Sequence, residues 1–314
     1  MTDRRILFII LAVVLTFSLI GCSNSGGFSK DTREKSMVTS DVAFPLTVTD
    51  SYNRKVTIER EPGKVISIAP NITEIIYALD MSKKLIGRTE YCDYPEDVKN
   101  ITSIGTLKEP NIEKIIELKP DLVIASTHFK REVVQKLEEL GMKVVVFYGQ
   151  ESFEGVYDTI EKVGMVLNAK ESAEKLVSDM KMKVQDVLDK VKDKPRPSVY
   201  YVVSFGKSGD FTAGRDTFIG QMIEMAGGKN AADDVQGWAY SLEKLVEKRP
   251  EIIICSKYNN SKQGIENANG YKDLEAVKKG KLYEIDNNLL DRQGPRLADG
   301  LMELARVIHP ESFK

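Results

Sequence analysis

Few side chains in the sequence are suited to covalent or metal chemistry. There are 2 histidines, His128 and His309, and 3 cysteines, Cys22, Cys92 and Cys255. The CxxC and HExxH patterns of metal sites do not occur, and neither do the GxSxG, P-loop and GxGxxG patterns of nucleophiles and phosphate-binding loops. We therefore expect no enzyme activity, no resident metal and no cofactor.

Aromatic side chains are better candidates for function, because they follow predicted strands. In a parallel sheet covered by helices, ligands bind beyond the carboxyl ends of the strands. Rings with a flat apolar face and a polar edge suit a large macrocycle or a chelate. The rings at these strand ends are Tyr91, Tyr94, His128, Phe129, Tyr148, Phe205, Phe211, Trp238 and Tyr240.

The histidines and cysteines each have an ordinary reading beside a functional one. His128 is either an axial ligand for a cobalt or iron centre or a satisfied surface histidine. Cys92 either ligates iron, pairs with Cys255 or is an inert loop thiol, which we favour. We expect His309 to be structural. With so few cysteines, we expect no disulfide framework to hold the fold.

The N-terminus predicts export and lipid attachment. Arg4 and Arg5 precede an apolar run, residues 6–20, which is shorter than a membrane-spanning helix needs and ends in Gly21 and Cys22. The segment 1–22 is similar to a bacterial lipoprotein signal, which would make Cys22 the lipidated first residue. The alternative is an ordinary signal peptide, or an uncleaved anchor, that happens to contain a cysteine.

The polar residues 23–43 are rich in Gly, Ser and charge, so they predict a flexible tether. About 270 residues remain, which suits two lobes rather than one core. The net charge of −2 argues against nucleic acid as a partner.

An internal repeat divides the remaining chain. NIEKIIELKPDLVIAS (111–126) matches SLEKLVEKRPEIIICS (241–256) without a gap. In each copy Asn111 or Ser241 is a candidate N-cap for a helix that must end before Pro120 or Pro250. The apolar run that follows is typical of a strand buried on both faces. Each lobe is therefore predicted to be an α/β sheet covered by helices.

Other segments complete this pattern. We expect a hairpin at 44–59, strands at 64–69, 142–148 and 198–203, a helix that stops at Gly141 and another over 217–226. The first strand feeds a helix that we expect to be capped by Asn71, with Glu74 at the capping-box position.

A long amphipathic helix is predicted at 169–195, between an N-terminal lobe at 44–168 and a C-terminal lobe at 196–314. About 22 helical residues would span ~33 Å and permit only small hinge motion. The predicted fold class is thus α/β, with two doubly wound lobes joined by one long helix and a ligand cleft between them.

These features together resemble the helical-backbone class of ABC-importer binding proteins for cobalamin, ferric siderophores and haem. The resemblance runs from about residue 44 to the end. It rests on a lipoprotein signal, two repeated lobes and six motifs in order, which are IAPNITEIIYAL, YCDYP, NIEKIIELKPDLVIA, FTAGRDTFIGQMIEMAGG, SLEKLVEKRPEIII and DRQGPRL.

The cobalamin binders are the nearest subgroup by these motifs. The resemblance implies a ligand-binding set of Tyr91, Asp93, Tyr94, His128, Phe211, Trp238 and Arg292. It also implies that Glu113 and Glu243 contact arginines on the two permease subunits; the other reading is that each carboxylate favours the positive end of its helix. The chain departs from the subgroup at Leu107, Ser126 and Leu289, where tryptophans are expected, and at Asn288, where an acidic residue is expected.

We therefore expect an extracytoplasmic, lipid-anchored monomer that captures a corrinoid and delivers it to an ABC importer. A ferric siderophore or haem is the alternative ligand within the same class. A surface enzyme or an adhesion module on similar lobes is the alternative from another class; turnover of a substrate would distinguish the enzyme.

Overall fold

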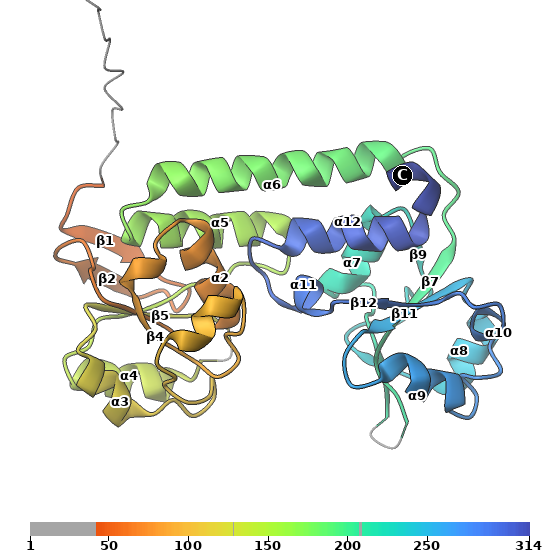
Figure 1. The fold of residues 1–314 in the computed structure, drawn as a ribbon, viewed down its shortest axis with the longest axis horizontal. Helices are drawn as coiled ribbons and strands as arrows, with labels where there is room; N and C mark the ends of the chain where they lie inside the picture. Colours follow the sequence, from red (N-terminus) through yellow and green to blue (C-terminus); the bar gives the residue numbers. More distant parts are fainter. Residues whose placement is uncertain (1–41, 128, 207–208) are drawn as a thin grey trace, which may run out of the picture. The chain divides into compact units, whose positions relative to one another are not determined.

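A computed structural model describes residues 42–127, 129–206 and 209–314. The described residues do not include the predicted signal with Cys22, most of the predicted tether, or His128. No described helix is long and apolar enough to cross a membrane. The mixed α/β architecture predicted from the sequence is confirmed (Figure 1).

The N-terminal lobe holds a hairpin and a parallel sheet. The predicted hairpin consists of β1 (Leu46–Thr49) and β2 (Lys55–Ile58), which pair antiparallel. The sheet has the order β4-β3-β5-β6, and all its pairs are parallel. Its strands are β3 (Val65–Ser67), β4 (Leu85–Arg88), β5 (Leu122–Ala125) and β6 (Val144–Val146). Every residue of β3, β5 and β6 is buried, as expected for strands covered on both faces.

The helices of this lobe lie between and after its strands. They are α2 (Pro70–Ala78), α3 (Ile112–Leu118), α4 (Arg131–Glu139) and α5 (Phe153–Val166), with short 3₁₀ turns η1 (Ser82–Lys84) and η2 (Glu96–Asn100).

The predicted cap of α2 is wrong. The helix begins at Pro70, and its N-cap is Ala69, which makes no side-chain cap. Proline suits this first position because its fixed φ is already helical and it lacks the N–H that would need a partner. Asn71 and Glu74 are therefore inside the helix, where their side chains are free to contact the other lobe.

The long helix α6 (Lys170–Val191) follows the first lobe. One stripe along it is buried, comprising Ala173, Val177, Met180, Val184, Val187 and Val191. This stripe packs on α5 and also on α12 (Leu297–Ile308), so the helix is in contact with both halves of the chain (Figure 1).

The C-terminal lobe is built on a sheet of order β10-β8-β7-β11-β12, with β9 beside β7. Its strands are β7 (Ser198–Ser204), β8 (Asp210–Thr212), β9 (Lys229–Asn230), β10 (Ala239–Tyr240), β11 (Ile252–Ser256) and β12 (Leu282–Ile285). The predicted strands β7 and β11 pair parallel, and β12, which was not predicted, pairs parallel with β11. The short strands β8 and β10 add an antiparallel edge that the sequence did not suggest.

The helices of the C-terminal lobe include the predicted α7 (Phe218–Met225), which Thr217 caps through its side chain. The others are α8 (Leu242–Lys248), α9 (Ser261–Asn267), α10 (Glu275–Lys278), α11 (Asn288–Asp291), α12 and the 3₁₀ turn η3 (Pro310–Phe313).

The repeat is confirmed at the level of structure. Asn111 and Ser241 both accept a hydrogen bond from the backbone N–H three residues on, and so cap α3 and α8. Both helices end in a left-handed residue, Lys119 (φ 48°) or Arg249 (φ 47°), just before the proline. The strand after each helix is β5 or β11, which lies inside its sheet.

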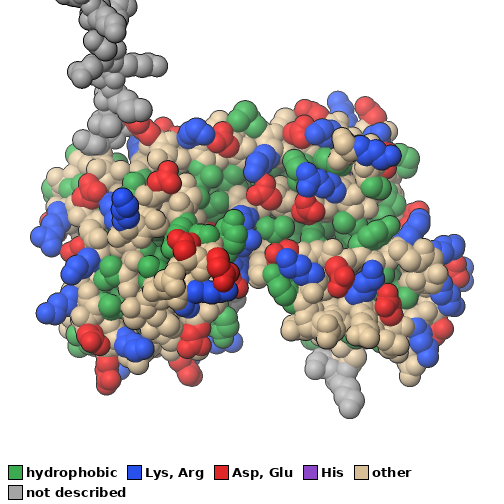
Figure 2. All heavy atoms as spheres, viewed as in Figure 1, with side chains coloured by type: hydrophobic (Ala, Val, Ile, Leu, Met, Phe, Trp, Pro, Cys, Tyr) green, Lys and Arg blue, Asp and Glu red, His purple; other side chains and the backbone are tan. Residues whose placement is uncertain are grey.

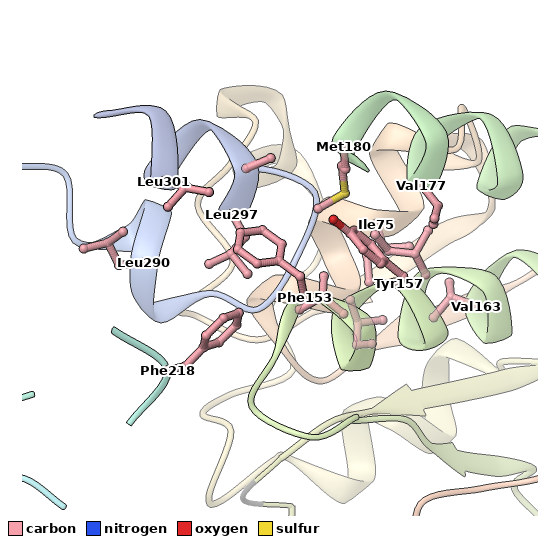
Figure 3. Packing of buried hydrophobic residues seen from close by; sticks show 14 of the residues in the cluster. Ile75, Phe153, Tyr157, Val163, Val177, Met180, Phe218, Leu290, Leu297 and Leu301 are labelled. Carbon is pink, nitrogen blue, oxygen red and sulfur yellow. The ribbon is translucent and has the colours of Figure 1, made fainter. Parts of the chain in front are cut away.

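One hydrophobic core runs through both lobes. It includes residues of α2, α5, α6, α7, α11 and α12 (Figure 3). Phe153 of α5 meets Phe218 of α7 edge to face, with ring centroids 5.5 Å apart. Burial of this shared apolar surface opposes separation of the lobes. Each lobe also has a smaller core of its own on the other face of its sheet.

An ion-pair cluster that is mostly buried, except at Asp93, also joins the lobes. The Glu74 carboxylate of α2 accepts hydrogen bonds from Arg296 Nε (2.9 Å) and Nη2 (2.7 Å) and from Arg292 Nη1 (3.0 Å). Arg292 Nη1 also donates to Asp93 Oδ1 at 2.7 Å. We call Glu74, Asp93, Arg292 and Arg296 the interlobe ion cluster. Its formal charges sum to zero.

We predict that Glu74→Gln lowers the free energy of unfolding by about 3 kcal/mol, because it leaves two mostly buried arginines short of a carboxylate. Glu303→Gln is the matched control, because Glu303 pairs with Arg306 on the exposed face of α12 and should change stability by less than about 1 kcal/mol. Urea unfolding measures both. Equal midpoints for the two variants would contradict a structural role for the cluster.

Candidate ligand-binding cleft

A cleft with a volume of about 320 Å³ lies where the two lobes face each other. In the space-filling view a hollow opens between the lobes on the side away from α6, with acidic and basic side chains together along its rim (Figure 2). Its lining comes from both lobes, and includes Asn71, Leu107, Ser126, Tyr148, Glu151, Phe218, Ile219, Trp238, Leu290, Asp291, Arg292 and Gln293.

The first lobe contributes the carboxyl ends of its strands. Ala69 and Pro70 follow β3, Ser126 follows β5 and Tyr148 follows β6, as the rule for parallel sheets predicts. Asn71 crosses the cleft floor, because its Nδ2 donates to Ser126 Oγ (3.2 Å) and to the Gln293 carbonyl of the other lobe (3.3 Å).

Trp238 supplies the largest partly open ring of the cleft, with 40% of the residue exposed. The backbone around it is held firmly, since its carbonyl accepts from the Thr212 N–H (2.7 Å) and the preceding Gly237 N–H donates to Asp216 (2.7 Å). Gly237 has a φ of +68°, which favours glycine. Phe211 is partly exposed and pairs with Ala239, next to Trp238, but it does not line the cleft.

Arg292 is the cationic side chain among the described residues that line the cleft. Burial lowers the pKa of its guanidinium, but hydrogen bonds to Asp93 and Glu74 outweigh burial and raise the pKa overall. Its Nη2 also reaches the Tyr91 carbonyl at 3.4 Å. The group is therefore charged at every physiological pH and already holds two carboxylates.

Asp291 and Glu151 are the acidic residues of the described lining. Burial raises the pKa of the Asp291 carboxyl, while a hydrogen bond from Asn287 Nδ2 (2.6 Å) opposes that change. Among the described residues, the cleft wall thus carries no excess of positive charge.

The loop with Tyr91, Asp93 and Tyr94 lies at the interlobe ion cluster. Tyr91 and Tyr94 are exposed, and the Arg296 guanidinium lies 3.8 Å from the centre of the Tyr94 ring. None of the three residues is part of the cleft lining itself. The loop is joined to the cleft through Arg292, which lines the cleft and donates to Asp93 and to the Tyr91 carbonyl.

Besides Tyr91, Tyr94 and Phe211, three more of the aromatic residues expected at the cleft lie elsewhere. Phe129 is buried in the core of the first lobe, and its carbonyl accepts from the Tyr52 hydroxyl. Phe205 packs on Tyr271, and Tyr240 packs on Tyr200. Position after a strand did not distinguish these rings from Tyr148 and Trp238, because a ring there can turn toward the sheet as well as toward the cleft.

Sequence reasoning also missed residues that shape the site. Asn71 and Glu74 were interpreted as a helix cap, whereas one lies on the cleft floor and the other holds Arg292. Phe218 and Ile219, at the start of α7, were taken only as parts of a helix. Leu107 and Ser126, which stand where tryptophans were expected, do line the cleft.

Cys92 and Cys255 are free and buried. Burial raises the pKa of the Cys92 thiol, which contacts Thr73 Oγ1 (3.1 Å), and burial also raises the pKa of Cys255, to about 12. The pairing of Cys92 with Cys255 is therefore wrong, and both thiols are poor nucleophiles. His309 is buried against the Gly227 carbonyl (3.1 Å), which fits a structural role. Among the described residues, no group of three or more His, Cys, Asp or Glu could hold a metal ion.

Residues 65–289 match the family model described as periplasmic binding protein. The "Uncharacterized ABC transporter substrate-binding lipoprotein YvrC" of Bacillus subtilis is 35% identical over 312 residues, 98% of this chain and 96% of that protein. The "Vitamin B12-binding protein" of Vibrio vulnificus (strain CMCP6) is 28% identical over 246 residues, 77% of this chain and 88% of that protein.

Solved structures agree with these matches. A "possible" iron-binding (periplasmic solute-binding) protein from Staphylococcus epidermidis has a TM-score of 0.71 and 31% identity, covering 80% of this chain and 100% of that one. The vitamin B12 binding protein BtuF of Vibrio cholerae has a TM-score of 0.68 and 25% identity, covering 81% and 98%. This chain, with its two α/β lobes and the cleft between them, belongs to the periplasmic binding protein family.

Proposed function

We propose that the protein is the substrate-binding lipoprotein of an ABC importer and that it captures a corrinoid. The observation that carries the choice of ligand is the charge balance of the cleft. Arg292 is already paired with Glu74 and Asp93, and the other described charges of the lining, on Asp291 and Glu151, are acidic.

This balance disfavours a ligand with several carboxylates. A ligand carboxylate that moves from water into the cleft loses its hydration. Without a free cationic partner there, this costs roughly several kcal/mol of binding free energy. A corrinoid instead carries neutral amides around its ring, and these pair with a guanidinium and with Asn71 by hydrogen bonding alone. The vitamin B12-binding relatives support the same ligand class.

An iron chelate is the second candidate. The Staphylococcus epidermidis protein, which its description calls possibly iron-binding, is 31% identical to this chain. In that case His128 would be a candidate axial ligand, but it lies outside the described residues. Two lobes of 44–168 and 196–314, joined by a helix within 169–195, are part of either proposal.

In the proposed complex Trp238 stacks on the macrocycle and Arg292 donates to its polar periphery. Tyr91, Asp93, Tyr94 and Phe211 contact the part of the ligand that projects from the cleft. A volume of about 320 Å³ is at the small end for ligand pockets, so a macrocycle would project.

We predict that Trp238→Ala weakens cyanocobalamin binding by roughly 1 to 4 kcal/mol, because a stacked anchor is lost. Tyr91→Ala and Arg292→Ala should weaken it as well. Titration calorimetry measures the affinities, and absorbance spectra with haemin and a ferric siderophore test the competing ligands. Tyr283→Ala is the control, since Tyr283 is an exposed ring on β12 outside the cleft.

Two results would revise this proposal. Unchanged affinity in all three variants, with the fold intact, would remove these residues from the site. Tight binding of haemin or a ferric siderophore, with none of cyanocobalamin, would make the iron chelate the ligand.

The proposal places the mature protein outside the cytoplasm on a lipid anchor at Cys22, with residues 23–43 as a tether. The Bacillus subtilis relative is named a lipoprotein, and this chain matches it over 96% of its length, which supports this location. We predict that Cys22→Ala blocks processing or releases the protein from membranes, because no acyl chains hold it. Fractionation and intact mass measure this, with Ser23→Ala as the control. Recovery of a processed Cys22→Ala protein in the membrane fraction would refute the anchor.

Docking is proposed to use Glu113 and Glu243. Both are exposed and occupy the first turn of α3 or α8. Two related carboxylates, one in each lobe, suit a partner with two related subunits.

We predict that Glu113→Ala with Glu243→Ala leaves cyanocobalamin binding intact but abolishes uptake and ATPase stimulation in a reconstituted importer. The matched control is Glu132→Ala with Glu154→Ala, because these residues are also exposed first-turn acids, in α4 and α5. The control variant loses the same favourable interaction between a carboxylate and the positive helix end, about 0.3 to 1 kcal/mol per residue. Its two residues do not lie in the repeat. Normal uptake by the Glu113/Glu243 variant would leave only the helix-end role.

A further inference from the structure

The repeat also duplicates an exposed aliphatic side chain. Ile116 of α3 and Val246 of α8 occupy equivalent positions in the two repeats and are 38% and 45% exposed. Each lies three residues after the proposed docking glutamate and one before a second glutamate, Glu117 or Glu247. Residues at i, i+3 and i+4 share one helix face. We call these sets the α3 stripe (Glu113, Ile116, Glu117) and the α8 stripe (Glu243, Val246, Glu247).

The hydrophobic cores do not account for the two aliphatic side chains, although Val246 also lines a hollow on its own lobe beside Arg249 and Leu274. The neighbouring Ile115 and Leu245 are fully buried and anchor the helices to the sheets. Ile116 and Val246 belong to none of the three hydrophobic cores within the described residues, either as buried members or as partly buried neighbours. Branched residues also favour a helix less than lysine or glutamate does. An exposed aliphatic residue alone is ordinary, but here it recurs with the same neighbours in both lobes.

The glutamates of the stripes are open to a partner. Within the described parts of the chain, none of the four carboxylates forms an ion pair. The lysines beside them are directed elsewhere: Lys114 Nζ toward the Ser103 carbonyl (3.5 Å) and Lys244 Nζ toward Asp234 (3.7 Å). Each stripe therefore presents two carboxylates around one aliphatic side chain.

We propose that the two stripes are paired contact faces, and that each packs its aliphatic side chain into an apolar hollow rimmed by arginine or lysine on one permease subunit. This inference rests on the proposed importer function. Charge complementarity argues for the basic rim. The stems of arginine and lysine supply apolar surface beside the aliphatic side chain. The duplication argues for a partner with two related subunits, and α3 and α8 both lie on the side of their lobe away from α6 (Figure 1).

The two kinds of residue in a stripe should affect docking differently. Exposed carboxylates at a rim speed the encounter and make it sensitive to salt. An aliphatic side chain that becomes buried mainly prolongs the complex, because most differences in affinity within one interface are in the dissociation rate. Full burial of an isoleucine or valine side chain corresponds to about tenfold or more in an equilibrium constant.

The test compares variants of the full-length protein by surface plasmon resonance on the cognate permease and ATPase complex in nanodiscs. Ile116→Ser with Val246→Ser should dissociate about tenfold faster or more, with an unchanged salt dependence of association and unchanged cyanocobalamin binding. Glu113→Ala with Glu243→Ala should instead slow association and reduce its salt dependence. Met182→Ser is the control, since Met182 is an exposed apolar residue on α6, at 60%.

The outcomes separate the inference from the proposed function. A normal dissociation rate for Ile116→Ser with Val246→Ser, together with slowed association for the glutamate variant, would overturn the apolar contact alone. Absence of complex formation by the unmodified protein would overturn the importer function and the stripes with it. An effect of Ile116→Ser without any effect of Val246→Ser would contradict the paired faces.

Discussion

The arrangement of the cleft depends on one buried carboxylate, that of Glu74. It comes from the first helix of the N-terminal lobe and binds two arginines of the segment that precedes α12. A charge removed from water is tolerated only when it is paired and hydrogen-bonded, so the two arginines must stay within reach of this carboxylate. Arg292 is thereby held at the cleft by a residue of the opposite lobe. The same ion pairs therefore fix both the position of Arg292 at the cleft and the distance between the lobes.

The shared hydrophobic core acts in the same direction. α6 packs on both α5 and α12, and Phe153 and Phe218 meet across the lobes. Since close-packed interiors do not deform continuously, the lobes are expected to move as bodies through small angles. A cleft of this kind is largely preformed. Its selectivity then depends on which charges and rings already line it, and less on closure around the ligand.

Much of this architecture could be predicted from the sequence, because the signals were local. Alternation, caps and prolines located the hairpin, the repeated helix and strand pairs, and the long helix. The cap of α2 was mispredicted because Asn71 and Glu74 match a local pattern, whereas Pro70 and contacts to residues 292–296 decide the structure. Those contacts join residues more than two hundred positions apart, and one sequence contains no local sign of them. For the same reason Phe129, Phe205 and Tyr240 could not be separated from Trp238, since the direction of a ring at a strand end depends on what packs beside it.

The geometry also links capture to delivery. Arg292 both lines the cleft and pairs with Glu74, so any motion that moves α2 away from the segment before α12 removes Arg292 from Glu74 or from the cleft. The stripes on α3 and α8 lie in different lobes, and each helix is followed directly by a strand inside its own sheet, β5 or β11. A partner that holds both stripes therefore acts on the two sheets rather than on flexible loops. Breaking the interlobe ion cluster costs roughly several kcal/mol, so thermal motion of the free protein rarely breaks it. A partner that binds the separated state more tightly would supply this free energy through its differential affinity.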